Sequence, residues 1–202
     1  MIIININANF DILYYLSNSV IKYKEQTTFE INTMLYLSQL LSIYDGHTTS
    51  KWGYLFTRNK FGAPISMEVL QELDNFSSSG ALRKDDDGYY SVSNEAMSLT
   101  VGKLEKSYMF EWRTKYILTS IDSILTKSFP IVIDAIQQEP GINLMDKINR
   151  TSVLHNSETA SLLFDDFKSI RDAVGGSNVN LVVPASLWLD CLAIHAQQEV
   201  PH

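Results

Sequence analysis

The stretch from residue 66 to residue 92 constrains the fold more than any other part of the chain. Ser66 can cap a short helix, because apolar residues recur after it at three- and four-residue spacing. These apolar positions are Val69, Leu70, Leu73 and Phe76. Three serines and a glycine at 77–80 end the helix, since serine competes with helical hydrogen bonds and glycine accepts a left-handed conformation. Strand-like runs then flank residues 85–88, whose Asp-Gly pair is a strong hairpin signal.

Two apolar helical patterns precede this stretch. Asn9 is the expected cap of the first, and Thr27 with Glu30 forms a capping box at the start of the second. A turn, a short amphipathic helix and a hairpin then follow in the order that is typical of a winged helix. We therefore expect residues 1–95 to form a winged-helix domain, with the hairpin as its wing.

The remaining residues, 96–202, are expected to form a helical domain joined to the first through a long helix. A helical pattern runs from Glu95 to about Lys127, and it either links the two domains or breaks near Gly102. Further helix starts and stops follow at Pro130, Pro140, Gly175 and Pro184. The expected fold class is mainly α with a small β-hairpin wing: an N-terminal winged helix followed by a C-terminal helical bundle.

The charge of the chain argues against general binding of nucleic acid. It has 16 basic and 23 acidic residues, a formal net charge of −7. A protein that coats a polyanion by electrostatics alone carries the opposite sign. The basic residues are concentrated around the hairpin, in the segment 51–115, and the flanking segments are acidic.

Cysteine usage and hydropathy bear on the compartment. The single cysteine, Cys191, excludes an intramolecular disulfide, and its apolar neighbours predict a buried thiol in a reducing compartment. The N-terminus has neither a basic region nor an apolar run of signal-peptide length, and nowhere do about 18 apolar residues follow one another. We expect a cytoplasmic protein that neither enters nor crosses a membrane.

Motifs that carry a reaction are missing or incomplete. The four histidines do not lie at the i, i+4 spacing at which two imidazoles meet one metal on a helix. Cys191 and His195 lie one turn apart, but their apolar neighbours favour a core cysteine over a reactive thiolate. The turn 85–88 lacks the alternating acids and the bidentate glutamate of a calcium loop. The expectation is a protein that is not an enzyme and has no catalytic residue, cofactor or metal.

Nucleic-acid contact is expected of a few basic residues and protein contact of a few aromatic ones. The candidates for phosphate contact are Arg58, Lys60, Arg83 and Lys84. The helix after Ser66 carries Glu68, Glu72 and Asp74 and no cation, so phosphate repulsion opposes its insertion into a groove. A protein-binding role is therefore favoured. The aromatic candidates are Trp52, Tyr54, Phe61, Tyr89 and Tyr90, with the alternative that at least half of them belong to the core.

Short motifs in the first 95 residues resemble two related groups of bacterial proteins. The motifs are Tyr54-Leu-Phe, then Lys60-Phe-Gly-Ala-Pro-Ile-Ser-Met-Glu-Val-Leu-Gln-Glu-Leu, then Gly80-Ala-Leu. One group is the Panacea domain of antitoxins. The other is the small middle component of ABC three-component anti-phage systems, which include the Lamassu type. Here Ala63 stands between the glycine and the proline that the families join, and Phe61 replaces their tyrosine.

The second resemblance implies an antiviral defence role. It implies a non-catalytic winged-helix subunit that bridges or regulates an SMC-like ATPase and an effector nuclease, with a non-specific contact of the wing with DNA. Two alternatives stay open. One is a Panacea-like antitoxin that neutralises a toxin, and the other is a winged-helix transcription regulator that binds DNA.

Overall fold

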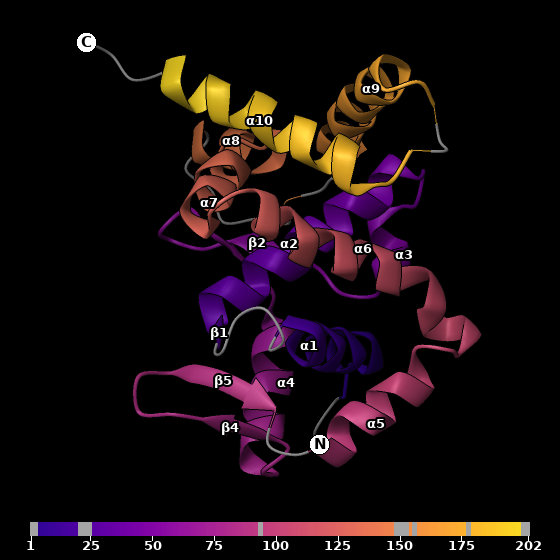
Figure 1. Cartoon of the computed structure of the whole chain (residues 1–202). Coiled ribbons are helices and arrows are strands. Elements are labelled where there is room, and N and C mark those ends of the chain that lie inside the picture. Colours follow the sequence, from indigo (N-terminus) through magenta and orange to yellow (C-terminus); the bar gives the residue numbers. More distant parts are fainter. Residues whose placement is uncertain are drawn as a thin grey trace.

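The computed structural model describes residues 4–19, 26–92, 95–147, 154, 157–176 and 179–198, and within them the protein is mainly helical (Figure 1). The helices of the first half are α1 (Ile6–Ser19), α2 (Thr28–Tyr44), α3 (Thr49–Trp52), α4 (Met67–Ser78) and α5 (Glu95–Leu104). Those of the second half are α6 (Tyr108–Thr126), α7 (Phe129–Gln137), α8 (Pro140–Lys147), α9 (Ser157–Ala173) and α10 (Val182–Gln198).

Two small antiparallel sheets accompany the helices. The three-stranded sheet has the order β1 (Gln26–Thr27), β5 (Tyr89–Val92) and β4 (Leu82–Lys84), and the two-stranded sheet pairs β2 (Thr57–Arg58) with β3 (Pro64–Ile65). Gly88 turns the chain between β4 and β5 with a φ of 87°. The hairpin predicted from the Asp-Gly pair is therefore confirmed. It lies at the opposite end of the molecule from α9 and α10 (Figure 1).

Helix α2 forms the centre of the fold. Its predicted capping box is present, because Thr27 Oγ1 accepts from the Glu30 backbone and the Glu30 carboxylate accepts from Thr27 N at 2.7 Å. Every residue from Ile31 to Tyr44 is buried. Helices α1, α6 and α9 and strand β3 pack around it. A helix apolar on all sides is expected to lie inside a protein, and this one does.

The first helix begins one turn earlier than predicted. Asn5, not Asn9, is its cap: the Asn5 side-chain oxygen accepts hydrogen bonds from the backbone of Asn7 and Ala8, both at 3.1 Å. Both asparagines satisfy the residue preference for a cap, so residue type alone does not distinguish them. Asn9 instead donates its side chain to Glu72 of α4 at 3.3 Å.

The predicted helix after Ser66 is confirmed. Ser66 Oγ accepts from Val69 N at 3.4 Å, and Val69, Leu73 and Phe76 are buried. Glu72 is buried on the same side, where it accepts from the backbone of Asn5 at 2.8 Å. Helix α4 is therefore attached to the start of α1 by a polar contact as well as by its apolar face.

The long pattern that starts at Glu95 is two helices. They meet at residues 105–107, shortly after Gly102, so the second of the two predicted alternatives is correct. The second helix, α6, packs against α1 and α2, and the hydrophobic core continues across the expected domain boundary at residue 95. The division into two domains stays a prediction.

Helix α10 packs against α6, α7 and α9. The rings of Trp188 and Phe167 lie 5.1 Å apart between α10 and α9. Within the part of the chain that the structure describes, no single helix has the length and apolar character to cross a bilayer. The helices Tyr108–Ile124 and Phe129–Gln137, which form a bent pair, have that length and apolar character only when they are taken together.

Candidate interaction surfaces

The β4–β5 hairpin presents two of the four basic candidates. Arg83 and Lys84 are exposed on β4. The Lys84 ammonium lies 5.1 Å from the centre of the Tyr90 ring. A hydrogen bond with Tyr90 and, less strongly, the charge of Asp74 raise the pKa of Lys84. Lys84 is therefore a cation at neutral pH and, like Arg83, accessible to an anionic partner.

The β2–β3 hairpin carries the other two basic candidates. Its turn is held by Asn59, whose side-chain oxygen accepts from the backbone of Phe61 and Ala63, both at 2.9 Å. Phe61 is 77% exposed, and the Lys60 ammonium lies 4.8 Å from its ring centre. Arg58 and Phe61 line a cleft of about 280 Å³ against α7 and α8. The basic candidates thus belong to two different hairpins.

The aromatic candidates divide between the core and the surface. Trp52, Tyr54 and Tyr90 are 0%, 3% and 2% exposed, so they are core residues and do not offer their rings to another protein. This corrects the prediction for these three and agrees with the alternative stated beside it. Phe61 and Tyr89 are exposed. The spacing of aromatic residues along the chain does not distinguish the two groups.

The exposed face of α4 is less acidic than its sequence. Glu72 points toward α1 and is buried. It was expected to repel a phosphate, but in this position it does not. Asp74 is exposed, Glu68 is partly exposed, and Met67 is 68% exposed. The surface of α4 combines an apolar side chain with acidic groups and has no lysine or arginine.

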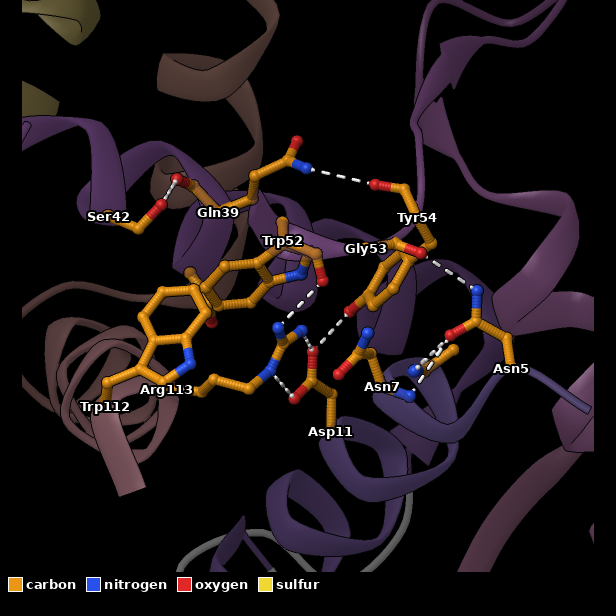
Figure 2. A network of polar contacts seen from close by, with 12 residues as sticks. Asn5, Asn7, Asp11, Gln39, Ser42, Trp52, Gly53, Tyr54, Trp112 and Arg113 are labelled. Atoms are coloured by element: carbon orange, nitrogen blue, oxygen red, sulfur yellow. Dashed lines mark hydrogen bonds and ion pairs between the residues drawn. The ribbon is translucent and has the colours of Figure 1, made fainter. Parts of the chain in front are cut away.

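A buried polar network joins three parts of the chain (Figure 2). The Arg113 guanidinium of α6 donates to both carboxylate oxygens of Asp11 in α1, through Nε at 2.8 Å and through Nη2. It also donates to the backbone oxygen of Trp52 at 2.7 Å. Tyr54 Oη donates to the same carboxylate at 2.7 Å. All four side chains are buried, and their hydrogen bonds join α1, α6 and residues 52–54.

Burial raises the pKa of the Asp11 carboxyl, against the lowering effect of Arg113 and Tyr54. The Asp11 carboxylate raises the pKa of Arg113 against the effect of burial, so the guanidinium stays a cation. Its central carbon lies 4.1 Å from the Trp52 ring centre, which adds a cation–π contact. This pair was not predicted from the sequence. The signal was a cation on the apolar stripe of α6 and an acid inside the apolar stripe of α1.

Another buried acid, Glu139, lies between α7 and α8. Its carboxylate accepts hydrogen bonds from Tyr36 Oη at 2.6 Å, Gly141 N at 2.8 Å and Ile142 N at 3.0 Å. Burial raises the pKa of Glu139 to about 7, against the lowering effect of these donors. Glu139 was not predicted from the sequence, because the proline and glycine that follow it mark a turn. Its contacts attach the start of α8 to α2.

A groove lies between α3 and the first turns of α6. We call it the α3–α6 groove; it has a volume of about 460 Å³ and is lined by His47, Lys51, Tyr108, Met109, Glu111, Trp112 and Lys115. Lys51 Nζ lies 3.1 Å from His47 Nδ1 and 4.6 Å from the centre of the Trp112 ring. No residue of this groove was a candidate in the sequence analysis, because it is assembled from segments some 60 positions apart.

Cys191 of α10 and two acidic residues of α9 lie at the surface. The Cys191 thiol is exposed, not buried as predicted, because Trp188 and Leu192 occupy the inward face of α10. Cys191 lines a cleft of about 360 Å³ between α10, α9 and the start of α8. The side chain of His195 lies outside the described residues. Asp165 and Asp166 are exposed on α9.

The described ionisable side chains do not gather into a metal site. Among the residues whose placement is described, no group of three or more histidine, cysteine, aspartate or glutamate side chains is arranged to hold an ion. The deepest charged groups bind one another and the backbone.

Comparison of the chain with family models, curated proteins and solved structures gives no match.

Proposed function

We propose that this protein is a non-catalytic winged-helix subunit of a bacterial anti-phage defence complex. In this proposal it is cytoplasmic and bridges or regulates an SMC-like ATPase and an effector nuclease. The order α1, β1, α2, α4, β4, β5 supports the winged-helix interpretation, as does the sheet order β1-β5-β4. In this interpretation helix α3 and the β2–β3 hairpin are an insertion before α4.

The surface of α4 is the observation that carries the protein-binding role. In a winged helix this helix is placed to enter a DNA groove, and a helix that does so requires cations for the phosphates. Helix α4 has Asp74 and Met67 exposed instead, with no lysine or arginine. An exposed methionine beside polar and acidic groups is a composition suited to another polypeptide.

The contacts of the buried ionisable side chains support a structural role for these groups. Asp11 and Arg113 bind each other, and Glu139 binds Tyr36 and two backbone amides. A catalytic acid or base needs access to a substrate proton within hydrogen-bond reach. These groups are buried and already hydrogen-bonded, so we assign to them the joining of helices.

A second candidate function is direct DNA binding through the wing. Arg83 and Lys84 are exposed cations, and Tyr89 of the same hairpin is partly exposed. In the main proposal the wing contacts DNA that the ATPase has loaded. In the alternative, a transcription regulator, the wing binds a specific duplex without any other protein.

Co-expression with the products of the neighbouring reading frames tests the proposal. We expect the tagged chain to retain an ATPase and an effector through affinity and size-exclusion steps, with nuclease present to remove bridging DNA. Recovery of one small toxin without an ATPase would show an antitoxin instead. A chain that elutes alone, yet shifts one specific duplex at moderate salt, would show a transcription regulator.

A further inference from the structure

We infer that the α3–α6 groove binds an acidic, amphipathic segment of a partner protein. This inference rests on the proposed function, because it names the surface through which the subunit is held in its complex. The groove combines exposed apolar side chains with accessible cations, and both are needed for such a segment.

The apolar part of the groove is unusually exposed. Tyr108 is 94% exposed and Met109 is 55% exposed at the start of α6, and both line the groove. Large side chains on a monomer surface are ordinary when single, but a contiguous group marks a contact site. Tyrosine and methionine are also enriched where proteins bind each other.

The floor of the groove is fixed before any partner binds. The Trp112 ring lies against His47, Trp52 and Tyr116, with ring centres 4.9, 5.7 and 6.1 Å away. Its indole N–H donates to the backbone oxygen of Met109 at 3.1 Å. Rigid aromatic rings lose little conformational entropy on binding, so Trp112 is suited to anchor an apolar side chain.

The cations of the groove select a carboxylate. Lys51 is exposed, and an ammonium that donates one N–H to His47 retains two further donors. Lys115, the second lysine of the groove, binds Asp45. Burial, and then the charges of Lys51 and Lys115, lower the pKa of His47, while Asp45 acts in the other direction. The remaining N–H groups of Lys51 are therefore the donors offered to a bound carboxylate.

The same groove is unfavourable for nucleic acid. Glu111 lines it, and the chain as a whole carries a net charge of −7, so an extended phosphate backbone meets repulsion beyond the two lysines. A polypeptide can place one or two carboxylates near Lys51 and apolar side chains over Met109 and Trp112. The occupant we assign is therefore an acidic segment with apolar residues between its acids.

Two exposed groove residues and two matched controls test the inference in the co-expressed complex. Lys51→Glu reverses the charge, and Tyr108→Ala removes the most exposed ring. Lys168→Glu and Phe164→Ala make the same kinds of change on the exposed face of α9. We expect each groove variant to lower partner recovery about tenfold or more, as loss of an interface anchor does, and each control to leave it within about twofold. Thermal melting of each isolated variant establishes that its fold is retained.

The outcomes separate this inference from the proposed function. If the wild type recovers its partners and Lys51→Glu and Tyr108→Ala recover them equally well, the groove assignment alone is wrong. A wild-type chain that recovers no partner overturns both. Loss of recovery on nuclease treatment, together with binding of a single-stranded oligothymidine that Lys51→Glu abolishes, makes nucleic acid the occupant. If changing an acidic residue of the partner to lysine restores its binding to the Lys51→Glu variant, the contact of Lys51 with a carboxylate is confirmed.

Discussion

Arg113 and Asp11 are 102 positions apart in the chain, yet the guanidinium of one contacts both oxygens of the other's carboxylate. The pair joins α6 to α1, and the backbone oxygen of Trp52 binds the same guanidinium. Neither charge is accessible to water. Each is therefore stable in the core only because the other is present.

Replacing Asp11 with alanine tests this dependence. The change leaves the Arg113 cation buried without its partner, which typically lowers the free energy of unfolding by about 3–5 kcal/mol. Urea unfolding followed by circular dichroism measures the loss. The double variant Asp11→Leu with Arg113→Met is expected to lose less, because no charge remains buried. Equal losses in the single and double variants would contradict the assignment.

An exposed ion pair provides the control for that experiment. Lys115 binds Asp45, but its side chain is 56% exposed. Water and salt screen such a pair, so Lys115→Ala is expected to change the free energy of unfolding by at most about 1 kcal/mol.

Glu139 is expected to make the stability of the protein depend on pH. Its pKa is raised from 4.5 to about 7, so the folded state holds the proton more tightly than the unfolded chain. This contribution to stability is complete below the ordinary pKa and is lost as pH rises through about 7. Between pH 5 and pH 8 the free energy of unfolding should fall by about 2.5 kcal/mol more for the wild type than for Glu139→Gln.

The glutamine variant also loses one acceptor for the amides of Gly141 and Ile142, so its absolute stability changes at every pH. The informative quantity is the difference between the two proteins across the pH series. A constant difference would show that Glu139 has an ordinary pKa in the folded state.

Two glycines should respond to alanine in opposite directions. Gly53 has a φ of 91°, a conformation that L residues adopt at a cost of about 1–2 kcal/mol. An added Cβ would also lie 2.2 Å from the Asn7 side chain, which must then move. Gly102 is inside α5 with open space around it, so alanine should stabilise by about 0.5–1 kcal/mol. Thermal melting should give a lower Tm for Gly53→Ala and a higher one for Gly102→Ala; shifts of the same sign would refute this reasoning.

The features that the sequence predicted are those in which neighbouring residues determine the structure. The capping box of Thr27 and Glu30, the cap at Ser66 and the hairpin at Gly88 each depend on contacts within a few positions. Choices between similar local signals were less secure. Asn5 and Asn9 are equally good caps by residue type, and the structure has Asn5 at the cap and Asn9 in contact with Glu72.

The features that the sequence did not predict depend on which face of a helix meets another. Burial of Tyr90 and exposure of Tyr89 follow from the pairing of β5 with β1 and β4, which is not contained in either residue. Exposure of Cys191 follows from the side on which α10 packs. The α3–α6 groove requires residues near 50 and near 110 to meet. The spacing of apolar residues alone does not specify that these two segments come into contact.

The wing prediction concerns Arg83 and Lys84, which are exposed on β4 and held there by pairing with Ser91 and Tyr90 of β5. Replacing both with alanine should leave the hairpin intact, because the strand pairing is made by the backbone. If the wing contacts phosphates, the variant's binding to non-specific duplex DNA should weaken, and its slope against log salt should fall by about 2, one for each lost cation.

Fluorescence anisotropy of a labelled duplex over a salt series measures both quantities, with the ATPase present to load the DNA. Lys168→Ala on α9 is the control, because it removes an exposed cation far from the hairpin in sequence. The salt slope distinguishes lost phosphate contacts from indirect damage to the complex, which would lower affinity and leave the slope unchanged. An unchanged affinity and slope would remove the wing from DNA binding and leave α4 and the α3–α6 groove, both suited to polypeptides, as the functional surfaces of this chain.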